Sequence, residues 1–236
     1  MQHNEKRWSQ IRMQLGSIVN VLFWIAIPLW AFGLLYIGSS GQRQPTAPLP
    51  DYDQKVRQLE TLMRAHADPM RMARAHMELA DACMTQKNYV AAEMELHTFQ
   101  LLAETHGSDD DRCQAMMALG NLYEAQTKYQ SAADFFQQSL DFDRNRFSAE
   151  GAAADRPITA VLANMLARDY DNLAVAYHLW GESCTTYGER HEKLTAAQKY
   201  LKQAQSCNPT TPGLAATLSS NLAATEAQIA DDDTHV

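Results

Sequence analysis

Histidines, cysteines and a run of aspartates are the residues of this sequence that could perform chemistry. The chain has 236 residues, among them eight histidines and four cysteines. The histidines are scattered, and the sequence contains no HExxH, CxxCH or GxSxG motif and no glycine-rich phosphate loop. Single histidines on amphipathic helices are usually surface or packing residues. The sequence therefore predicts that the protein is not an enzyme and that it needs no cofactor and no metal.

The acidic run from Asp109 to Asp111 has a structural explanation. Gly107 can end one helix and Ser108 can cap the next. Three carboxylates in the first turn then lie where the helix dipole favours negative charge. A calcium or magnesium site would need further ligands converging from elsewhere in the chain. The run therefore predicts the start of a helix rather than a metal site.

The N-terminal region contains the longest apolar segment. No charged residue occurs between Arg12 and Arg43, and residues 17–37 read SIVNVLFWIAIPLWAFGLLYI. About 20 apolar residues in a helix span the roughly 30 Å hydrocarbon core of a bilayer. This predicts a transmembrane helix at 17–37, after a short cytoplasmic segment at 1–16. A cleaved signal peptide is the alternative, although its apolar core would be longer than usual.

The charges that flank this segment predict its orientation. Lys6, Arg7 and Arg12 precede it, whereas only Arg43 follows soon after it. The positive-inside rule then places the N-terminus in the cytoplasm and the rest of the chain in the periplasm of a bacterial inner membrane. Residues 38–52 contain three prolines and no hydrophobic period, so they are expected to form an extended linker. The folded domain is predicted at 53–231, with a tail at 232–236.

An internal repeat organises this domain. Small and bulky residues recur at the same seven positions of each copy of the repeat. Counted from the start of a copy, these are positions 7, 8, 11, 17, 20, 24 and 27, and they define the repeat frame. The first copy has Leu79, Ala80, Cys83, Tyr89, Ala92, Leu96 and Phe99, the second has Leu119, Gly120, Tyr123, Tyr129, Ala132, Phe136 and Ser139, and the third has Leu173, Ala174, Tyr177, Leu194, Ala197, Leu201 and Ala204. This pattern resembles the tetratricopeptide repeat, a pair of antiparallel helices. The 40 residues between Tyr89 and Tyr129 are similar to the spacing of the longer, kinesin-light-chain type of this repeat.

The resemblance implies an all-α fold, an α-solenoid of about three helical hairpins with flanking helices. The repeats are predicted at about 73–106, 113–146 and 167–211, with a capping helix at 212–231 and a further helix from Tyr52 to His66 in front. About eleven extra residues between the two helices of the third repeat should extend or loop out its turn. Residues from Phe147 to Arg156 are expected to form a small-residue loop, and a helix is expected after Pro157.

The four cysteines are predicted to be free thiols. In the repeat frame, Cys83 and Cys113 lie about 15 Å apart along parallel helices, which is too far for a disulfide. Cys184 and Cys207 fall near opposite ends of their hairpin. Free thiols slightly favour a reducing compartment, which opposes the periplasmic orientation.

Members of this family bind peptides in a concave groove that is lined by the first helix of each repeat. The resemblance assigns to this groove Arg74, Met77, Asp81, Met84, Gln114, Met117, Asn121, Glu124, Arg168, Asp171, Val175 and His178. The subtype that clamps the C-terminal carboxylate of chaperones uses lysine and asparagine where Met77 and Asp81 stand here. An aspartate would repel that carboxylate, so a chaperone partner is not expected. The methionines can adapt to an apolar or helical ligand, or they can pack between helices.

The net charge narrows the class of partner. The chain has 20 basic and 28 acidic residues, and the first 50 positions contain four and one of these, which leaves a net charge of −11 beyond them. Such a domain is not expected to bind nucleic acid or anionic lipid. Protein or peptide partners, of basic or neutral character, are predicted.

The sequence thus predicts a membrane-anchored scaffold for protein–protein interactions in a membrane or envelope complex. Two alternatives remain open. The chain could be an integral accessory subunit whose transmembrane helix makes the main contacts, or an organellar import receptor with its repeats in the cytosol.

Overall fold

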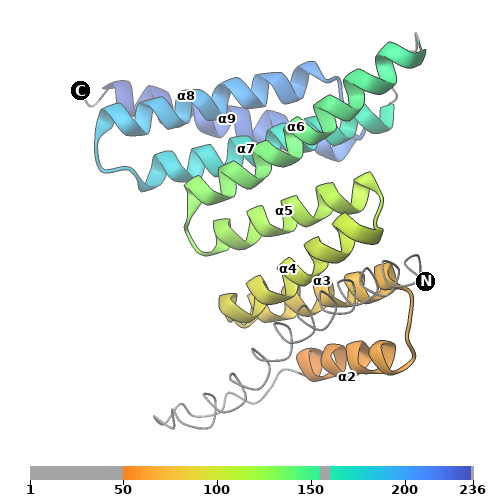
Figure 1. Ribbon diagram of the computed structural model, residues 1–236. Coiled ribbons are helices and arrows are strands. Elements are labelled where there is room, and N and C mark those ends of the chain that lie inside the picture. Colours follow the sequence, from red (N-terminus) through yellow and green to blue (C-terminus); the bar gives the residue numbers. More distant parts are fainter. Residues whose placement is uncertain (1–49, 155–159, 235–236) are drawn as a thin grey trace, which may run out of the picture. The chain divides into compact units, whose positions relative to one another are not determined.

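The computed structural model describes residues 50–154 and 160–234, and all regular structure in these ranges is α-helical, as the sequence predicted. Figure 1 shows the helices stacked as antiparallel hairpins in chain order, from α2 in orange to α9 in blue. Their bounds are Pro50–Arg64 (α2), Pro69–Thr85 (α3), Tyr89–His106 (α4), Asp109–Ala125 (α5), Tyr129–Ala154 (α6), Ala160–Ser183 (α7), Tyr187–Ser206 (α8) and Pro212–Thr234 (α9).

The predicted membrane span lies outside the described residues and stays a prediction. Among the helices at 50–154 and 160–234, none combines the length and the apolar character needed to cross a bilayer. The predicted linker at 38–52 ends too late, because α2 already begins at Pro50. Proline is tolerated in the first turn of a helix, since its missing N–H would have no partner there.

Side chains at the starts of α3 and α5 stabilise these helices by hydrogen bonds to backbone N–H groups. Ser108 and Asp111 form a capping box, in which each side chain accepts a hydrogen bond from the other residue's backbone N–H. Asp68 accepts hydrogen bonds from the N–H groups of Met70 and Arg71 at the start of α3. The acidic run therefore begins α5, as the sequence predicted, and the described residues contain no cluster suited to a metal ion.

Helix α6 is longer than predicted. The loop expected from residue 147 is wrong up to Ala154, because α6 continues to that residue. Alanine and glutamate in this stretch are good helix formers, so a small-residue sequence does not by itself end a helix. The extra residues of the third repeat lengthen both of its helices, and only Cys184–Thr186 separate α7 from α8.

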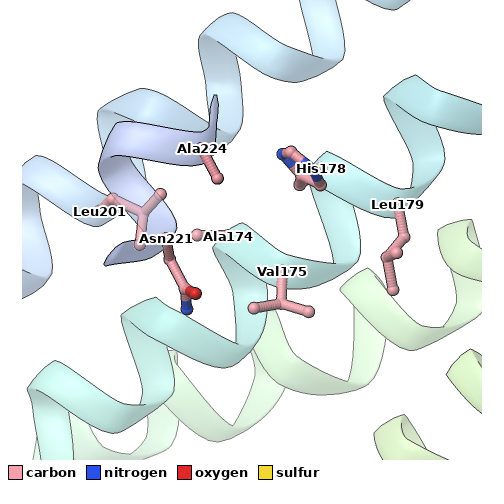
Figure 2. Close-up of a pocket in the computed structure, with 7 residues that line it drawn as sticks. All are labelled: Ala174, Val175, His178, Leu179, Leu201, Asn221 and Ala224. Atoms are coloured by element: carbon pink, nitrogen blue, oxygen red, sulfur yellow. The ribbon is translucent and has the colours of Figure 1, made fainter. Parts of the chain in front are cut away.

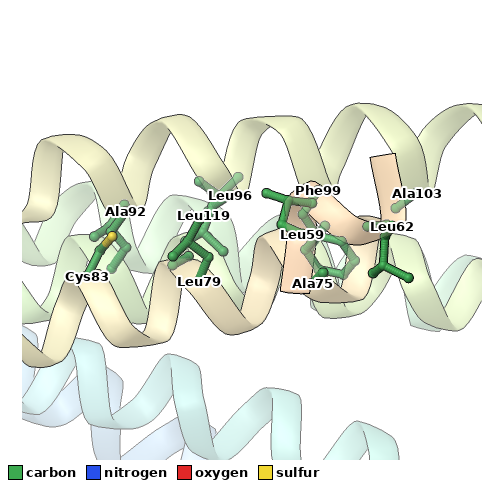
Figure 3. Packing of buried hydrophobic residues seen from close by; sticks show 14 residues of the cluster. Leu59, Leu62, Ala75, Leu79, Cys83, Ala92, Leu96, Phe99, Ala103 and Leu119 are labelled. Atoms are coloured by element: carbon green, nitrogen blue, oxygen red, sulfur yellow. The ribbon is translucent and has the colours of Figure 1, made fainter. Parts of the chain in front are cut away.

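The core is built from the repeat positions themselves. Figure 3 shows Leu79 of α3 near Leu96 of α4, with Phe99 of α4, Leu119 of α5 and Leu59 of α2 in the same cluster. Each of these side chains is less than a tenth exposed. The helices pack so closely that small residues occupy their crossing points.

A polar cluster interrupts this core between the second and third hairpins. Asp143 of α6 and Asp169 of α7 are only 1% and 3% exposed. Cys113 Sγ donates a hydrogen bond to Asp143 Oδ1 at 3.0 Å, and Ser139 Oγ donates to Asp169 Oδ1 at 3.4 Å. Asp169 Oδ2 has no hydrogen-bond partner among the described residues. Burial, with the nearby charge of Asp143, raises the pKa of Asp169 to about 8.

All four cysteines are free, which confirms the prediction. Cys83 and Cys113 are buried, whereas Cys184 and Cys207 are half-buried.

Candidate functional site

The surface lined by the first helices α3, α5 and α7 is the candidate binding site. Helix α9 lies beside α7 and α8, in the place that the first helix of a fourth repeat would take. The twelve residues assigned to a groove from the sequence all belong to α3, α5 and α7. The structure divides them into two groups according to the direction of their side chains.

The first group points into solvent. Its members are exposed: Arg74, Asp81, Gln114, Asn121 and Arg168. These side chains are available to a ligand without any rearrangement. Both the basic and the acidic members are therefore potential contacts.

The second group lies against the neighbouring helices and is partly or fully covered: Met77, Met84, Met117, Glu124, Asp171, Val175 and His178. Met77 and Met84 pack against the core cluster that includes Leu79 and Leu119. These two methionines contribute to packing between helices, which was the alternative reading of the methionine-rich strip.

Helix α9 supplies hydrogen bonds to two residues of this second group. Asn221 Nδ2 donates to Asp171 Oδ1 at 2.9 Å. The hydroxyl of Thr225 donates to the backbone carbonyl of Asn221, so its oxygen is left to accept from His178 Nδ1 at 3.0 Å. Helix α9 thus covers part of the surface that the sequence assigned to the third repeat.

A pocket of about 140 Å³ opens where α7, α8 and α9 meet. Figure 2 shows Val175, His178 and Leu179 of α7 on one side and Asn221 and Ala224 of α9 on another. Ala174 and Leu201 complete the lining. The walls are mostly apolar, and the volume is below that of sites for drug-sized ligands. It suits one apolar side chain of a bound segment.

Three carboxylates of this surface have raised pKa values. Loss of water around the side chain raises the pKa of Asp81, Glu124 and Asp171, one on each of the three first helices. For Asp81, the charge of Lys55 partly opposes this effect. Asp81 and Glu124 form no ion pair within the described part of the chain. A cation that approached them would relieve this unfavourable desolvated charge.

Sequence reasoning missed the contribution of α9 and α8 to the pocket. The repeat frame ends before α9, so nothing in that frame predicts that Asn221 and Ala224 meet α7. The burial of Asp143 and Asp169, in contrast, could have been predicted from the repeat frame. Asp169 occupies the repeat position held by the buried alanines Ala75 and Ala115, and Asp143 occupies that of Ala103.

Comparison with known proteins agrees with this architecture. The model of the tetratricopeptide repeat family matches residues 71–145. No curated protein matches this sequence. Three solved structures are similar to this chain, and the first of them reaches a TM-score of 0.50. The yeast histone chaperone Hif1, described as a scaffold protein recruiting protein complexes to core histones, has a TM-score of 0.50 at 10% identity, over 78% of this chain and 95% of that one. BtubC (BKLC) from P. vanneervenii has a TM-score of 0.39 at 19% identity, over 79% and 85% of the two chains. A putative kinesin light chain from Podosopora anserina with nearly identical TPR-like repeats has a TM-score of 0.39 at 15% identity, over 75% and 86%.

Proposed function

We propose that this chain, which carries tetratricopeptide repeats over residues 71–145, is a membrane-anchored, non-enzymatic scaffold that binds a basic segment of a partner protein on its concave surface. The observation that carries this proposal is the pair of carboxylates at Asp81 and Glu124, which have raised pKa values and no ion-pair partner among the described residues. A lysine or arginine of the partner supplies a positive charge to Glu124 and adds to that of Lys55 at Asp81. The repeat fold itself is a module for protein–protein interaction.

The pocket beside α9 supports the same mode of binding. An extended or helical segment that places a cation near Glu124 can place an apolar side chain among Val175, Leu179 and Ala224. Charge then orients the partner, and the apolar contact adds affinity. The apolar sequence at 17–37 supports a tether to the membrane, which raises the local concentration of a membrane-bound partner.

Neutralising the two carboxylates is expected to weaken partner binding about tenfold. Asp81→Asn together with Glu124→Gln keeps the shape of both side chains and removes both charges. The full chain is purified from its own membranes in mild detergent, and the proteins that come with it are identified and quantified by mass spectrometry. A set of partners that is lost with the double variant supports the concave surface.

The matched control removes two carboxylates from the outer side of α6, where Asp134 and Asp141 are exposed. Asp134→Asn with Asp141→Asn makes the same change in net charge, and it is expected to leave the partners bound. Equal losses in both double variants would rule out a specific role for the concave surface. Membrane subunits recovered at constant ratio with both variants would favour the accessory-subunit alternative, in which residues 17–37 make the main contacts.

The orientation in the membrane is a separate prediction. The excess of basic residues before residue 17 predicts a cytoplasmic N-terminus and an external repeat domain. In bacterial cells, alkaline phosphatase fused after residue 236 is expected to be active, and a cytoplasmic fluorescent reporter at the same site is expected to be dark. The reverse pattern would reject the periplasmic placement and favour the import-receptor alternative.

A further inference from the structure

Helix α4 exposes an apolar stripe on its outer side. Val90, Met94 and Leu101 are 69%, 52% and 58% exposed, and they make up half of the exposed large hydrophobic residues in the described part of the chain. Spacings of four and seven residues place all three on one face of the helix. These three residues are called the α4 stripe below.

The other hairpins show that the fold does not require apolar residues at these positions. In the repeat frame, Val90, Met94 and Leu101 correspond to three residues of α6 and three of α8. The matching residues are Gln130, Asp134 and Asp141 in α6 and Thr195, Lys199 and Ser206 in α8, and all six are polar and exposed. Among these three helices, exposed apolar residues at the three positions thus occur only in α4, in the first repeat. Clustered apolar residues on an exposed surface mark a site of interaction.

The charges around the stripe indicate the kind of partner. Helix α4 contains no lysine or arginine between Tyr89 and His106. Of its three glutamates, Glu104 is exposed, whereas Glu93 accepts a hydrogen bond from Tyr123 and Glu95 pairs with His76. The nearest lysine or arginine before the stripe is Lys87, and the nearest after it is Arg112, which donates to the backbone carbonyl of Glu104 and pairs with Asp109. The α6 residues that match Met94 and Leu101 are themselves aspartates. The end of the stripe near Leu101 and Glu104 is therefore acidic, as is the repeat domain as a whole, and this fits an apolar stripe that is flanked by lysine or arginine.

Two other occupants are opposed by the same charges. A second copy of the chain would bring two acidic surfaces together, since residues beyond position 50 have a net charge of −11. An anionic membrane surface would repel the glutamates of α4 for the same reason. The helix-in-groove and helix-on-helix modes of recognition, in contrast, use contacts at spacings of three, four and seven residues.

We infer that the α4 stripe is a docking site for a basic amphipathic helix of a partner protein, separate from the concave surface. The apolar faces of the two helices pack together, and a cation of the partner lies over Glu104 of α4. The chain then has two binding surfaces, one on the first helices of its repeats and one on the outer side of its first hairpin. Such an arrangement lets one scaffold hold two segments at once.

A local crosslinking experiment tests this inference on the full chain in mild detergent. A photoreactive benzoylphenylalanine replaces His97, which is exposed on the stripe side of α4, or Lys202, which holds the same repeat position in α8. The probe is a biotinylated 18-residue helical peptide with a leucine stripe flanked by lysines, and its counterpart carries glutamates in place of the lysines. The lysine peptide is expected to crosslink at position 97 at least tenfold more than at position 202, and at least tenfold more than the glutamate peptide does at position 97.

The decisive variant replaces the three residues of the α4 stripe by the residues that α6 has at the same repeat positions. Val90→Gln, Met94→Asp and Leu101→Asp together are expected to reduce crosslinking at position 97 at least tenfold, with an unchanged helical circular dichroism spectrum. The control replaces exposed apolar residues elsewhere, Met63→Gln and Val161→Gln, and is expected to retain it. The Asp81 and Glu124 double variant is expected to retain it too, which separates this site from the concave surface. Equal crosslinking by both peptides, equal crosslinking at both positions, or crosslinks only between copies of the chain would overturn the inference.

Discussion

Replacing Gly120 by alanine is expected to destabilise the protein by about 3 kcal/mol, the upper end of the usual cost of overpacking a core. A β-carbon at position 120 would lie 2.4 to 2.8 Å from three ring carbons of Phe136. Phe136 is 1% exposed and is held by the second core cluster, so its ring has no free space to enter. Chemical unfolding of the full chain in mild detergent, followed by circular dichroism, measures the change in the free energy of unfolding.

Gly188 provides the matched control, because a β-carbon there meets no atom within 4 Å. Gly188→Ala is expected to leave stability unchanged or to raise it slightly, since alanine favours a helix over glycine. Adding Phe136→Leu to Gly120→Ala should recover part of the loss, and the double-mutant cycle measures this coupling. Equal stability of the two alanine variants would contradict the close crossing of α5 and α6.

Replacing Asp169 by asparagine is expected to remove a marked dependence of stability on pH. Burial raises the pKa of Asp169 from its ordinary value of 3.8 to about 8, so the folded protein keeps a proton that the unfolded chain releases. Stability that depends on this proton is fully present below pH 4 and falls as pH rises to 8, by on the order of 1 kcal/mol for each pH unit. Asparagine is neutral throughout and has nearly the same shape as aspartate.

The groups near this carboxylate are Cys113 of α5, Asp143 and Arg146 of α6, and Arg168 of α7. The measurement is the free energy of unfolding at pH 5, 6, 7 and 8 for the wild-type protein and the Asp169→Asn variant. The wild type should lose more stability than the variant over this range, and the difference should grow at each step. Asp134→Asn on the exposed side of α6 is the control and should follow the wild type. Parallel curves for the wild type and Asp169→Asn would mean that Asp169 is already ionised in the folded protein at pH 5.

Much of the fold was predictable because its signals are local. The recurrence of small and bulky residues predicted the helical hairpins, and Ser108 with the following aspartates predicted the start of α5. These features depend on helical periodicity and on capping, which act over a few residues. The end of α6 was not predicted, because small residues such as those at 151–154 are compatible with both a helix and a loop.

The candidate site was only partly predictable, for a related reason. The repeat frame identified the first helices, but the outward direction of Asp81 and the covered position of Met77 depend on neighbouring helices. The pocket also requires α9, which lies outside the frame. The α4 stripe was visible as Val90, Met94 and Leu101, yet a sequence alone does not distinguish an exposed apolar residue from a buried one.

The sequence by itself determined the all-α class, the helical hairpins and the acidic character of the repeat domain. Periodicity, capping and charge are properties of short segments, and they need no knowledge of distant contacts. The tertiary structure alone decided that Asp143 and Asp169 meet away from water, that α9 covers Asp171 and His178, and that α4 leaves apolar side chains in solvent. These features arise from the packing of helices far apart in the chain, because burial and the pKa of a side chain depend on all of its neighbours.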